Sequence, residues 1–169
     1  LALKNRVELP EKEPEALAEW FHRGSNRKSL SLYLEGFAVT VAVMQTAEAI
    51  ERVAYEHMED LAADNVVYAE IRFAPILCTQ RGLNLEEVVT SALKGLKRGR
   101  EDFGVDFGLI LCAMRDQTVS LETAELAVAF REKGVVGFDL AGPEAGFPAA
   151  AHRRALSIAR SAGLHLTIH

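Results

Sequence analysis

The sequence has few of the residues that mark several specialised protein classes. Its 169 residues include two cysteines, five prolines and one tryptophan. Two isolated cysteines, Cys78 and Cys112, cannot form a disulfide framework and are typical of a reducing compartment, so we expect a cytoplasmic protein. No apolar run approaches the ~20 residues that a membrane helix requires, so we expect no membrane partner.

Basic residues are also in the minority. Nineteen Lys and Arg residues face twenty-four Asp and Glu residues, for a formal net charge of −5. The one basic cluster lies at 94–100, and nucleic-acid binding usually needs a wider basic surface, so we expect no nucleic-acid partner. A composition that is 49% hydrophobic and 25% charged is ordinary for a globular domain, and excludes disordered, collagen-like and coiled-coil classes.

What the sequence does contain is a series of short apolar runs rich in β-branched residues. They lie at 66–71, 105–111, 135–140 and 164–168. Each suits a β-strand by length and residue type. Their starts are separated by about 30 to 40 residues, as expected for successive strand–helix–strand units.

The segments between these runs read as helices. The first covers 85–101, with Asn84 and Glu87 as a capping box, and the second covers 120–130, with Ser120 as its N-cap. A third is expected over 149–162. This alternation predicts a parallel sheet with helices outside it.

The first 64 residues follow another pattern. Helical segments are expected from Pro14 to about Phe21, over 30–43 and over 46–64; the middle one is strongly apolar and the last is amphipathic. We therefore expect a helical arm over 1–64, followed by four β/α units over 65–169.

Four parallel strands suit either an open doubly wound sheet or part of a closed barrel. No strand is followed by a Gly-x-Gly-x-x-Gly or Gly-x-x-x-x-Gly-Lys loop, which removes the usual nucleotide-phosphate sites. The strands carry charge instead, at Glu70 and Arg72 on one face, at Arg115 and at Asp139. A barrel interior near its carboxyl-end rim explains such residues. The alternative is an ion-pair layer of these four residues with a purely structural role.

The histidines provide few candidate metal ligands. His57 and Glu59 match only half of the zinc deaminase signature, because no Pro-Cys-x-x-Cys follows, so we expect His57 at a core edge. His22 and His152 lie on polar helical stretches and are expected to be solvated. His169 ends the last strand, where a rigid strand can aim an imidazole at a barrel mouth, but a zinc site needs at least three protein ligands.

Gly142 follows the third strand and has two interpretations. A tight turn can require a glycine, or the missing Cβ can let a ligand approach the backbone N–H at the rim. The spacing does not separate the two.

Taken together, four blocks of sequence resemble the adenosine deaminases. The blocks are 67–75 (VYAEIRFAP), 111–115 (LCAMR), 136–144 (VGFDLAGPE) and 165–169 (HLTIH). The resemblance covers nearly the whole chain and implies a (β/α)8 barrel of the metal-dependent amidohydrolase kind. The four strands would be its second to fifth, and the helical arm would lie between its first and second.

The resemblance also implies roles for individual residues. His169 matches a zinc ligand, and Gly142 matches the glycine whose backbone N–H meets the purine ring. Asp139 and Arg115 match supporting positions near the site. The helix that gates the pocket with apolar side chains would carry three of the remaining candidates, which are Tyr33, Leu34 and Phe37.

Other parts of the family pattern are missing from this sequence. The His-x-His pair of the first strand would precede Leu1, and the catalytic Glu, three residues past the zinc histidine, would follow His169. We therefore expect no catalytic residue here, and zinc that is absent or weakly held. The chain, which begins without Met, is expected to be the middle of a longer deaminase, with the remaining half of the barrel as a possible partner.

In the intact enzyme the resemblance implies zinc-dependent hydrolytic deamination of adenosine to inosine and ammonia, with this chain alone inactive. Two alternatives stay open. The first is a deaminase of another aminopurine, such as adenine or a modified adenine nucleoside. The second is a non-catalytic α/β fragment that binds a partner.

Overall fold

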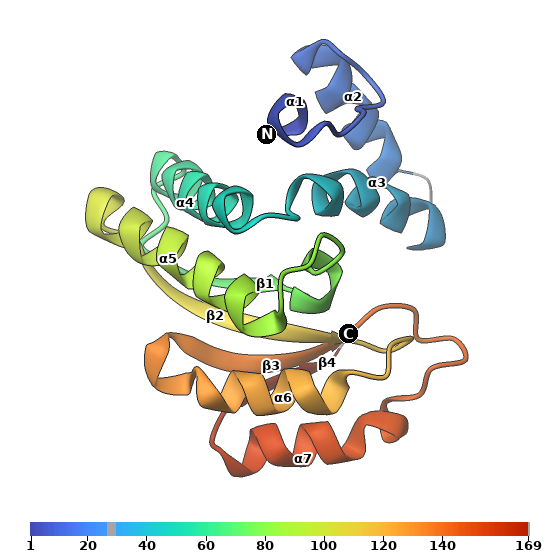
Figure 1. The fold of residues 1–169 in the computed structure, drawn as a ribbon, viewed down its shortest axis with the longest axis vertical. Coiled ribbons are helices and arrows are strands. Elements are labelled where there is room, and N and C mark those ends of the chain that lie inside the picture. The colour runs from blue at the N-terminus through green and yellow to red at the C-terminus, as the bar shows by residue number, and fades with distance from the viewer. Residues whose placement is uncertain (27–29, 169) are drawn as a thin grey trace.

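A four-stranded parallel sheet organises the chain from residue 68 onward in a computed structural model, which describes residues 1–26 and 30–168 (Figure 1). The strands are β1 (Tyr68–Phe73), β2 (Asp106–Met114), β3 (Val135–Ala141) and β4 (His165–Ile168), paired in the order β1-β2-β3-β4. A doubly wound sheet reverses its strand order, whereas a barrel adds each strand beside the last. The order therefore favours a segment of a barrel, and all four predicted strands are confirmed.

Three helices follow the strands and lie on one face of the sheet (Figure 1): α5 (Leu85–Phe103), α6 (Ser120–Ala129) and α7 (Arg153–Ser161). The capping box of α5 is confirmed. Asn84 Oδ1 accepts from the Glu87 N–H, and Glu87 Oε2 accepts from the Asn84 N–H, both at 2.8 Å. Gly104, in the left-handed conformation at φ 72°, ends the helix as expected for a glycine C-cap.

The other two helices begin differently from the prediction. Ser120 is not the N-cap of α6: that position is Val119, whose carbonyl accepts both the N–H and the hydroxyl of Thr123. The expected helix over 149–162 is divided into a 3-10 turn, η3 (Ala149–His152), and α7. His152 is buried rather than solvated, because its ring packs against the loop after β2 with Nε2 3.1 Å from the Arg115 carbonyl.

The two faces of the sheet carry different side chains. The outer face, under the helices, is apolar and fully buried at Leu109, Leu111, Phe138 and Leu140. The inner face is polar. The parallel register places Cys112 beside Asp139 and Asp139 beside Thr167, so polar groups from neighbouring strands meet there. A buried apolar face and a polar opposite face explain why the runs combine apolar residues with isolated charges.

The N-terminal region consists of α1 (Ala2–Asn5), α2 (Pro14–Ser25), α3 (Leu30–Val43) and α4 (Ala47–Ala63). Thr46 caps α4 by accepting from the Ala49 N–H at 3.2 Å. Helix α4 packs directly on α5, and its residues Ile50 and Met58 are buried. His57 is exposed, so the prediction of a core-edge position was wrong.

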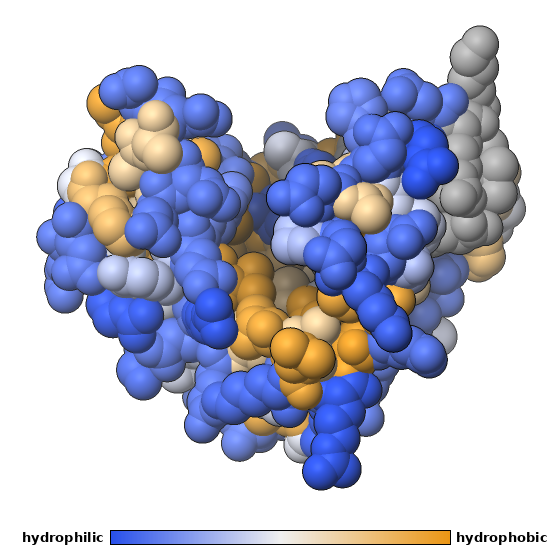
Figure 2. Space-filling model, turned by 90° about the horizontal axis from the view of Figure 1, so that it is seen from above, coloured by the Kyte–Doolittle hydropathy of each residue, from blue (hydrophilic) through white to orange (hydrophobic). Residues whose placement is uncertain are grey.

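The described residues include no helix that combines the length and the apolar character needed to cross a membrane. Seen from above, the molecule is hollowed between two hydrophilic lobes, and the floor of the hollow is hydrophobic (Figure 2).

Candidate active site

The carboxyl ends of the four strands lie at one edge of the sheet, and Gln45 connects the N-terminal helices to that edge. Gln45 is 3% exposed. Its Nε2 donates to the Leu77 carbonyl at 2.8 Å, and its Oε1 accepts from the Gln80 N–H at 2.9 Å. Leu77 belongs to η1 (Pro75–Cys78), which follows β1 directly. Gln45 therefore holds the end of α3 beside the loop after β1.

Sequence reasoning missed Gln45. The sequence marks Gln45 only by its position, because it is an amide side chain between an apolar helix and the N-cap Thr46. Asn5, buried to 9% exposure, serves a similar purpose by donating from Nδ2 to the Val43 carbonyl at 3.3 Å. Together, the two amides attach α1 and the loop after β1 to the C-terminal end of α3.

Two of the predicted gating residues form an exposed aromatic pair on α3. Tyr33 and Phe37 are 42% and 46% exposed, and their rings meet edge to face with centroids 5.2 Å apart. Leu34 lies on the same helix, but its side chain is outside the described part of the chain. The two rings therefore offer an exposed apolar surface that a ligand could cover.

Asp139 is the most enclosed charge on the inner face. It is 0% exposed and accepts from Thr167 Oγ1 at 2.7 Å and from Cys112 Sγ at 3.3 Å. Arg72 Nη1 lies 3.5 Å from Asp139 Oδ2. The alternative interpretation of the strand charges was an ion-pair layer of Glu70, Arg72, Arg115 and Asp139. Of these four residues, Arg72 and Asp139 form an ion pair. Glu70, a third member, accepts from the Tyr68 hydroxyl at 3.1 Å.

Burial and charge both act on the groups around Asp139. Burial, together with the nearby Asp139 carboxylate, raises the pKa of the Cys112 thiol far above its usual range. Cys112 therefore stays protonated and donates its S–H. Partial desolvation, and then the hydrogen bond to Glu70, raise the pKa of the Tyr68 hydroxyl in the same way. Both groups act as neutral donors at physiological pH.

Arg115, predicted as a supporting residue, holds two loops together at the strand ends. It is 5% exposed, its Nη1 donates to the Phe147 carbonyl at 3.0 Å, and its backbone N–H donates to the Ala141 carbonyl at 2.8 Å. Its own carbonyl lies 3.1 Å from His152 Nε2, which must carry the proton because a carbonyl only accepts. The loops after β2 and β3 are therefore joined through one residue.

Gly142 needs to be glycine for a local reason. Its φ is +102°, a left-handed value that side chains disfavour, and an added Cβ would lie 3.1 Å from Met114 Cε. The turn interpretation of Gly142 is thus sufficient by itself. The interpretation in which a ligand approaches the Gly142 N–H stays a prediction.

The predicted metal ligand, His169, lies outside the described residues. Over 1–26 and 30–168, no group of three or more His, Cys, Asp or Glu side chains is arranged to hold a metal ion. The described residues by themselves therefore do not fit a zinc site.

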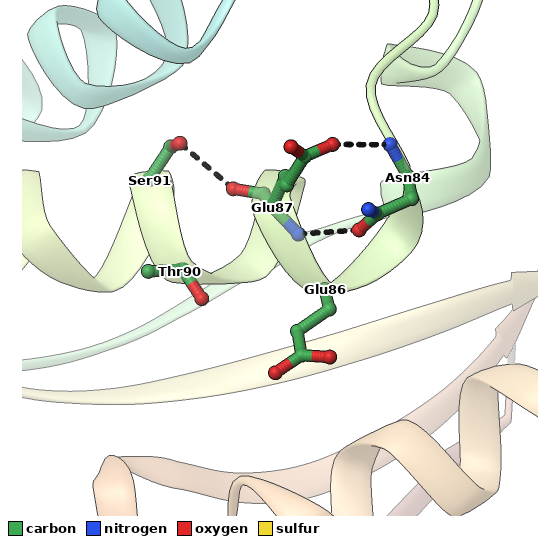
Figure 3. A pocket seen from close by; sticks show the side chains of 5 residues that line it. All are labelled: Asn84, Glu86, Glu87, Thr90 and Ser91. Atoms are coloured by element: carbon green, nitrogen blue, oxygen red, sulfur yellow. Dashed lines mark hydrogen bonds between the residues drawn. The ribbon is translucent and has the colours of Figure 1, made fainter.

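Two open grooves lie in the helical layer rather than on the inner face. One, of about 390 Å³, surrounds the start of α5 at Glu86 and Thr90, and its polar groups Asn84, Glu87 and Ser91 hydrogen-bond within the helix start (Figure 3). The other, of about 670 Å³, lies between α5 and α6. The capping bonds already engage the polar groups of the first groove, so that groove is not the candidate site.

The chain is similar to known proteins along its whole length. The family model described as adenosine deaminase matches residues 1–169. The chain is 50% identical over 166 residues to the adenosine deaminase of Mycobacterium leprae, in an alignment that covers 95% of this chain and 46% of that protein. The chain thus spans about half the length of the curated relatives it matches.

Solved structures are also similar to this chain over about half of their own length. An adenine deaminase from Arthrobacter aurescens is similar with a TM-score of 0.82 and 30% identity, over 99% of this chain and 50% of that chain. The Arabidopsis protein ADAL, in complex with IMP, is similar with a TM-score of 0.77 and 27% identity, over 90% of this chain and 48% of that chain.

Proposed function

Because the chain belongs to the adenosine deaminase family and folds as part of a (β/α)8 barrel, we propose that it serves the hydrolytic deamination of adenosine to inosine and ammonia. The observation that carries this proposal is the family match over residues 1–169. The geometry supports it, because the polar inner face and the loops after β1, β2 and β3 meet at the carboxyl edge, where barrel enzymes place their sites.

The chain would supply the substrate side of the site. The Gly142 N–H donates to the purine ring, since no Cβ keeps the ring from the backbone. Arg115 holds the loop that carries Gly142 in place, and Asp139 supports the inner face below it. Tyr33, Leu34 and Phe37 close over the purine as an apolar lid, which excludes bulk water and strengthens the hydrogen bonds beneath it.

Zinc enters the proposal only through the family, with His169 as one ligand. Because the described residues do not form a metal site, we derive no step of the reaction through a metal ion. A zinc site needs at least three protein ligands and the resemblance assigns one, His169, so we propose that this chain alone is inactive and that the remaining half of the barrel is its partner.

A second candidate substrate is adenine, or an adenine nucleotide. The observation that favours it is the similarity to an adenine deaminase and to an IMP complex among solved structures. Adenosine is preferred for this chain because its identity to an adenosine deaminase, 50%, exceeds the 30% identity to the adenine deaminase.

The test is ammonia release by the purified zinc-supplied protein that carries this chain, with adenosine, adenine and AMP as separate substrates. A kcat/KM for adenosine at least ten-fold above the other two supports the proposal. Preference for adenine or AMP supports the second candidate. Absence of ammonia from all three, in a folded protein, overturns both and favours a non-catalytic role. The 169-residue chain, assayed beside it, should release none.

The cytoplasm is the compartment we propose, on the ground that both described cysteines, Cys78 and Cys112, are buried free thiols. Subcellular fractionation that finds the protein among secreted proteins would contradict this.

A further inference from the structure

One polar side chain from each of the four strands contributes to a single cluster on the inner face. The cluster consists of Arg72 from β1, Cys112 from β2, Asp139 from β3 and Thr167 from β4, and we call it the Asp139 layer. Each of the other three side chains lies within 3.5 Å of the Asp139 carboxylate. The Asp139 layer therefore connects all the strands of the described sheet through one buried group.

Stability alone is a weak reason to keep such a charge. Asp139 is 0% exposed, and a buried carboxylate costs free energy unless it is hydrogen-bonded and paired. The pair with Arg72, whose side chain is 42% exposed, is partly screened by solvent and offsets only part of that cost. What the Asp139 layer adds is directional: three donors on three strands must all point at one carboxylate.

The Asp139 layer joins β3 to the carboxyl end of β4. The parallel ladder places Asp139 beside Thr167 and Leu140 beside Ile168. The 2.7 Å bond from Thr167 Oγ1 to Asp139 Oδ1 adds a side-chain bond across the first of these pairs, so it orients Thr167 as well as fixing the register of β4.

The Asp139 layer also lies close to the proposed substrate contacts. Asp139 precedes Gly142 by three residues, and Thr167 is the second-last residue described in β4 and precedes His169 by two. A displacement of about 1 Å in such a position can cost about a hundred-fold in rate, because reacting groups leave their productive geometry.

We propose that Asp139 is a positioning residue, which through Thr167 orders the carboxyl end of β4 at the substrate side of the sheet. This inference rests on the proposed function, since it assigns the Asp139 layer a part in the same site. Arg72 pairs with the Asp139 charge, and the neutral Cys112 thiol donates from the third side.

The test uses Thr167→Val in the purified protein that carries this chain. Asp139→Asn would leave Arg72 beside a neutral amide and can unfold the sheet, whereas Thr167→Val removes one hydroxyl at nearly constant shape. Thr167→Ser restores the hydroxyl, and Thr90→Val removes a hydroxyl from the outer surface of α5 as the matched control. Each variant is measured for kcat and KM with adenosine, for thermal midpoint, and for amide hydrogen exchange in β4.

We expect Thr167→Val to lower kcat about ten-fold or more and to accelerate exchange in β4, with a lowered thermal midpoint because the buried carboxylate loses one donor. Thr167→Ser and Thr90→Val should behave as the wild type. Unchanged kcat and exchange in Thr167→Val overturn the inference. So does a lowered thermal midpoint with unchanged kcat per folded molecule, which would mark the Asp139 layer as structural only. If the wild type deaminates no purine, the proposed function fails, and the exchange comparison alone decides whether Thr167 orders β4.

Discussion

Replacing Gly95 by alanine is expected to destabilise the contact between α4 and α5, although alanine is the better helix former. Gly95 lies in the middle of α5, where a Cβ would be 2.2 Å from the Glu51 carbonyl oxygen and 2.8 Å from Ala54 Cβ. Real Cβ atoms do not approach a backbone oxygen so closely, and a backbone atom cannot rotate away. The two helices must therefore separate before the methyl group fits.

Two opposing terms decide the size of the effect. Alanine gains about 1 kcal/mol over glycine inside a helix. Overpacking a closely packed contact costs about 1–3 kcal/mol, and a clash with backbone belongs at the upper end. The net expectation is a loss of about 2 kcal/mol in the free energy of unfolding.

Urea denaturation followed by circular dichroism measures this loss. The matched control is Gly36→Ala in the middle of α3, where the nearest atom to an added Cβ is Phe21 Cδ1 at an ordinary 3.7 Å. That variant should be more stable than the wild type by about 1 kcal/mol. If Gly95→Ala were as stable as the wild type or more so, the close approach of α4 to α5 would be refuted.

Three further predictions concern the site and its supports. Gln45→Leu leaves the Leu77 carbonyl and the Gln80 N–H without their partner, so it should cost about 1–3 kcal/mol in urea denaturation and raise KM for the purine; an unchanged KM would separate Gln45 from the site. Gly142→Ala must hold alanine at φ +102°, so it should lose about 1–3 kcal/mol in the free energy of unfolding. The loss in kcat/KM, expressed as a free energy, should be larger; if the two losses are equal, the turn interpretation of Gly142 is favoured. Burial raises the pKa of Cys78 from 9.0 to about 11. Its contribution to stability is therefore present below pH 9.0 and lost as pH rises towards about 11, because the unfolded thiol ionises first. In Cys78→Ala the free energy of unfolding, measured by denaturation over about 3 pH units from pH 8 to pH 11, should fall less steeply with pH. An unchanged slope would contradict the role of the Cys78 thiol.

The features predicted correctly from the sequence depend on neighbours along the chain. The four strands and the capping box of Asn84 and Glu87 depend on residues within one or two turns of each other. Two errors were local, because Val119 rather than Ser120 caps α6 and His57 is exposed. The remaining error involves a distant group. In the 149–162 segment the first turn is a 3-10 turn, and there His152 Nε2 lies 3.1 Å from the Arg115 carbonyl, 37 residues away.

The candidate site shows the same division. The charge pattern of the apolar runs drew attention to Asp139 and Arg115, and the family resemblance placed them and Gly142 near the site. Gln45 was missed, since an amide next to a helix cap is a weak signal that does not name its partners. Its role arises from a carbonyl 32 residues and an N–H 35 residues further along the chain.

By itself, the sequence determined the order of strands and helices, the polarity of the two sheet faces and the family resemblance. These follow from short-range periodicity and from residue types, which the chain carries in one dimension. Only the tertiary structure decided which polar groups meet. Asp139 gains the donors Cys112 and Thr167 from positions 27 and 28 residues away. Such contacts exist only after parallel pairing has brought neighbouring strands into register, and register is a property of the assembled sheet.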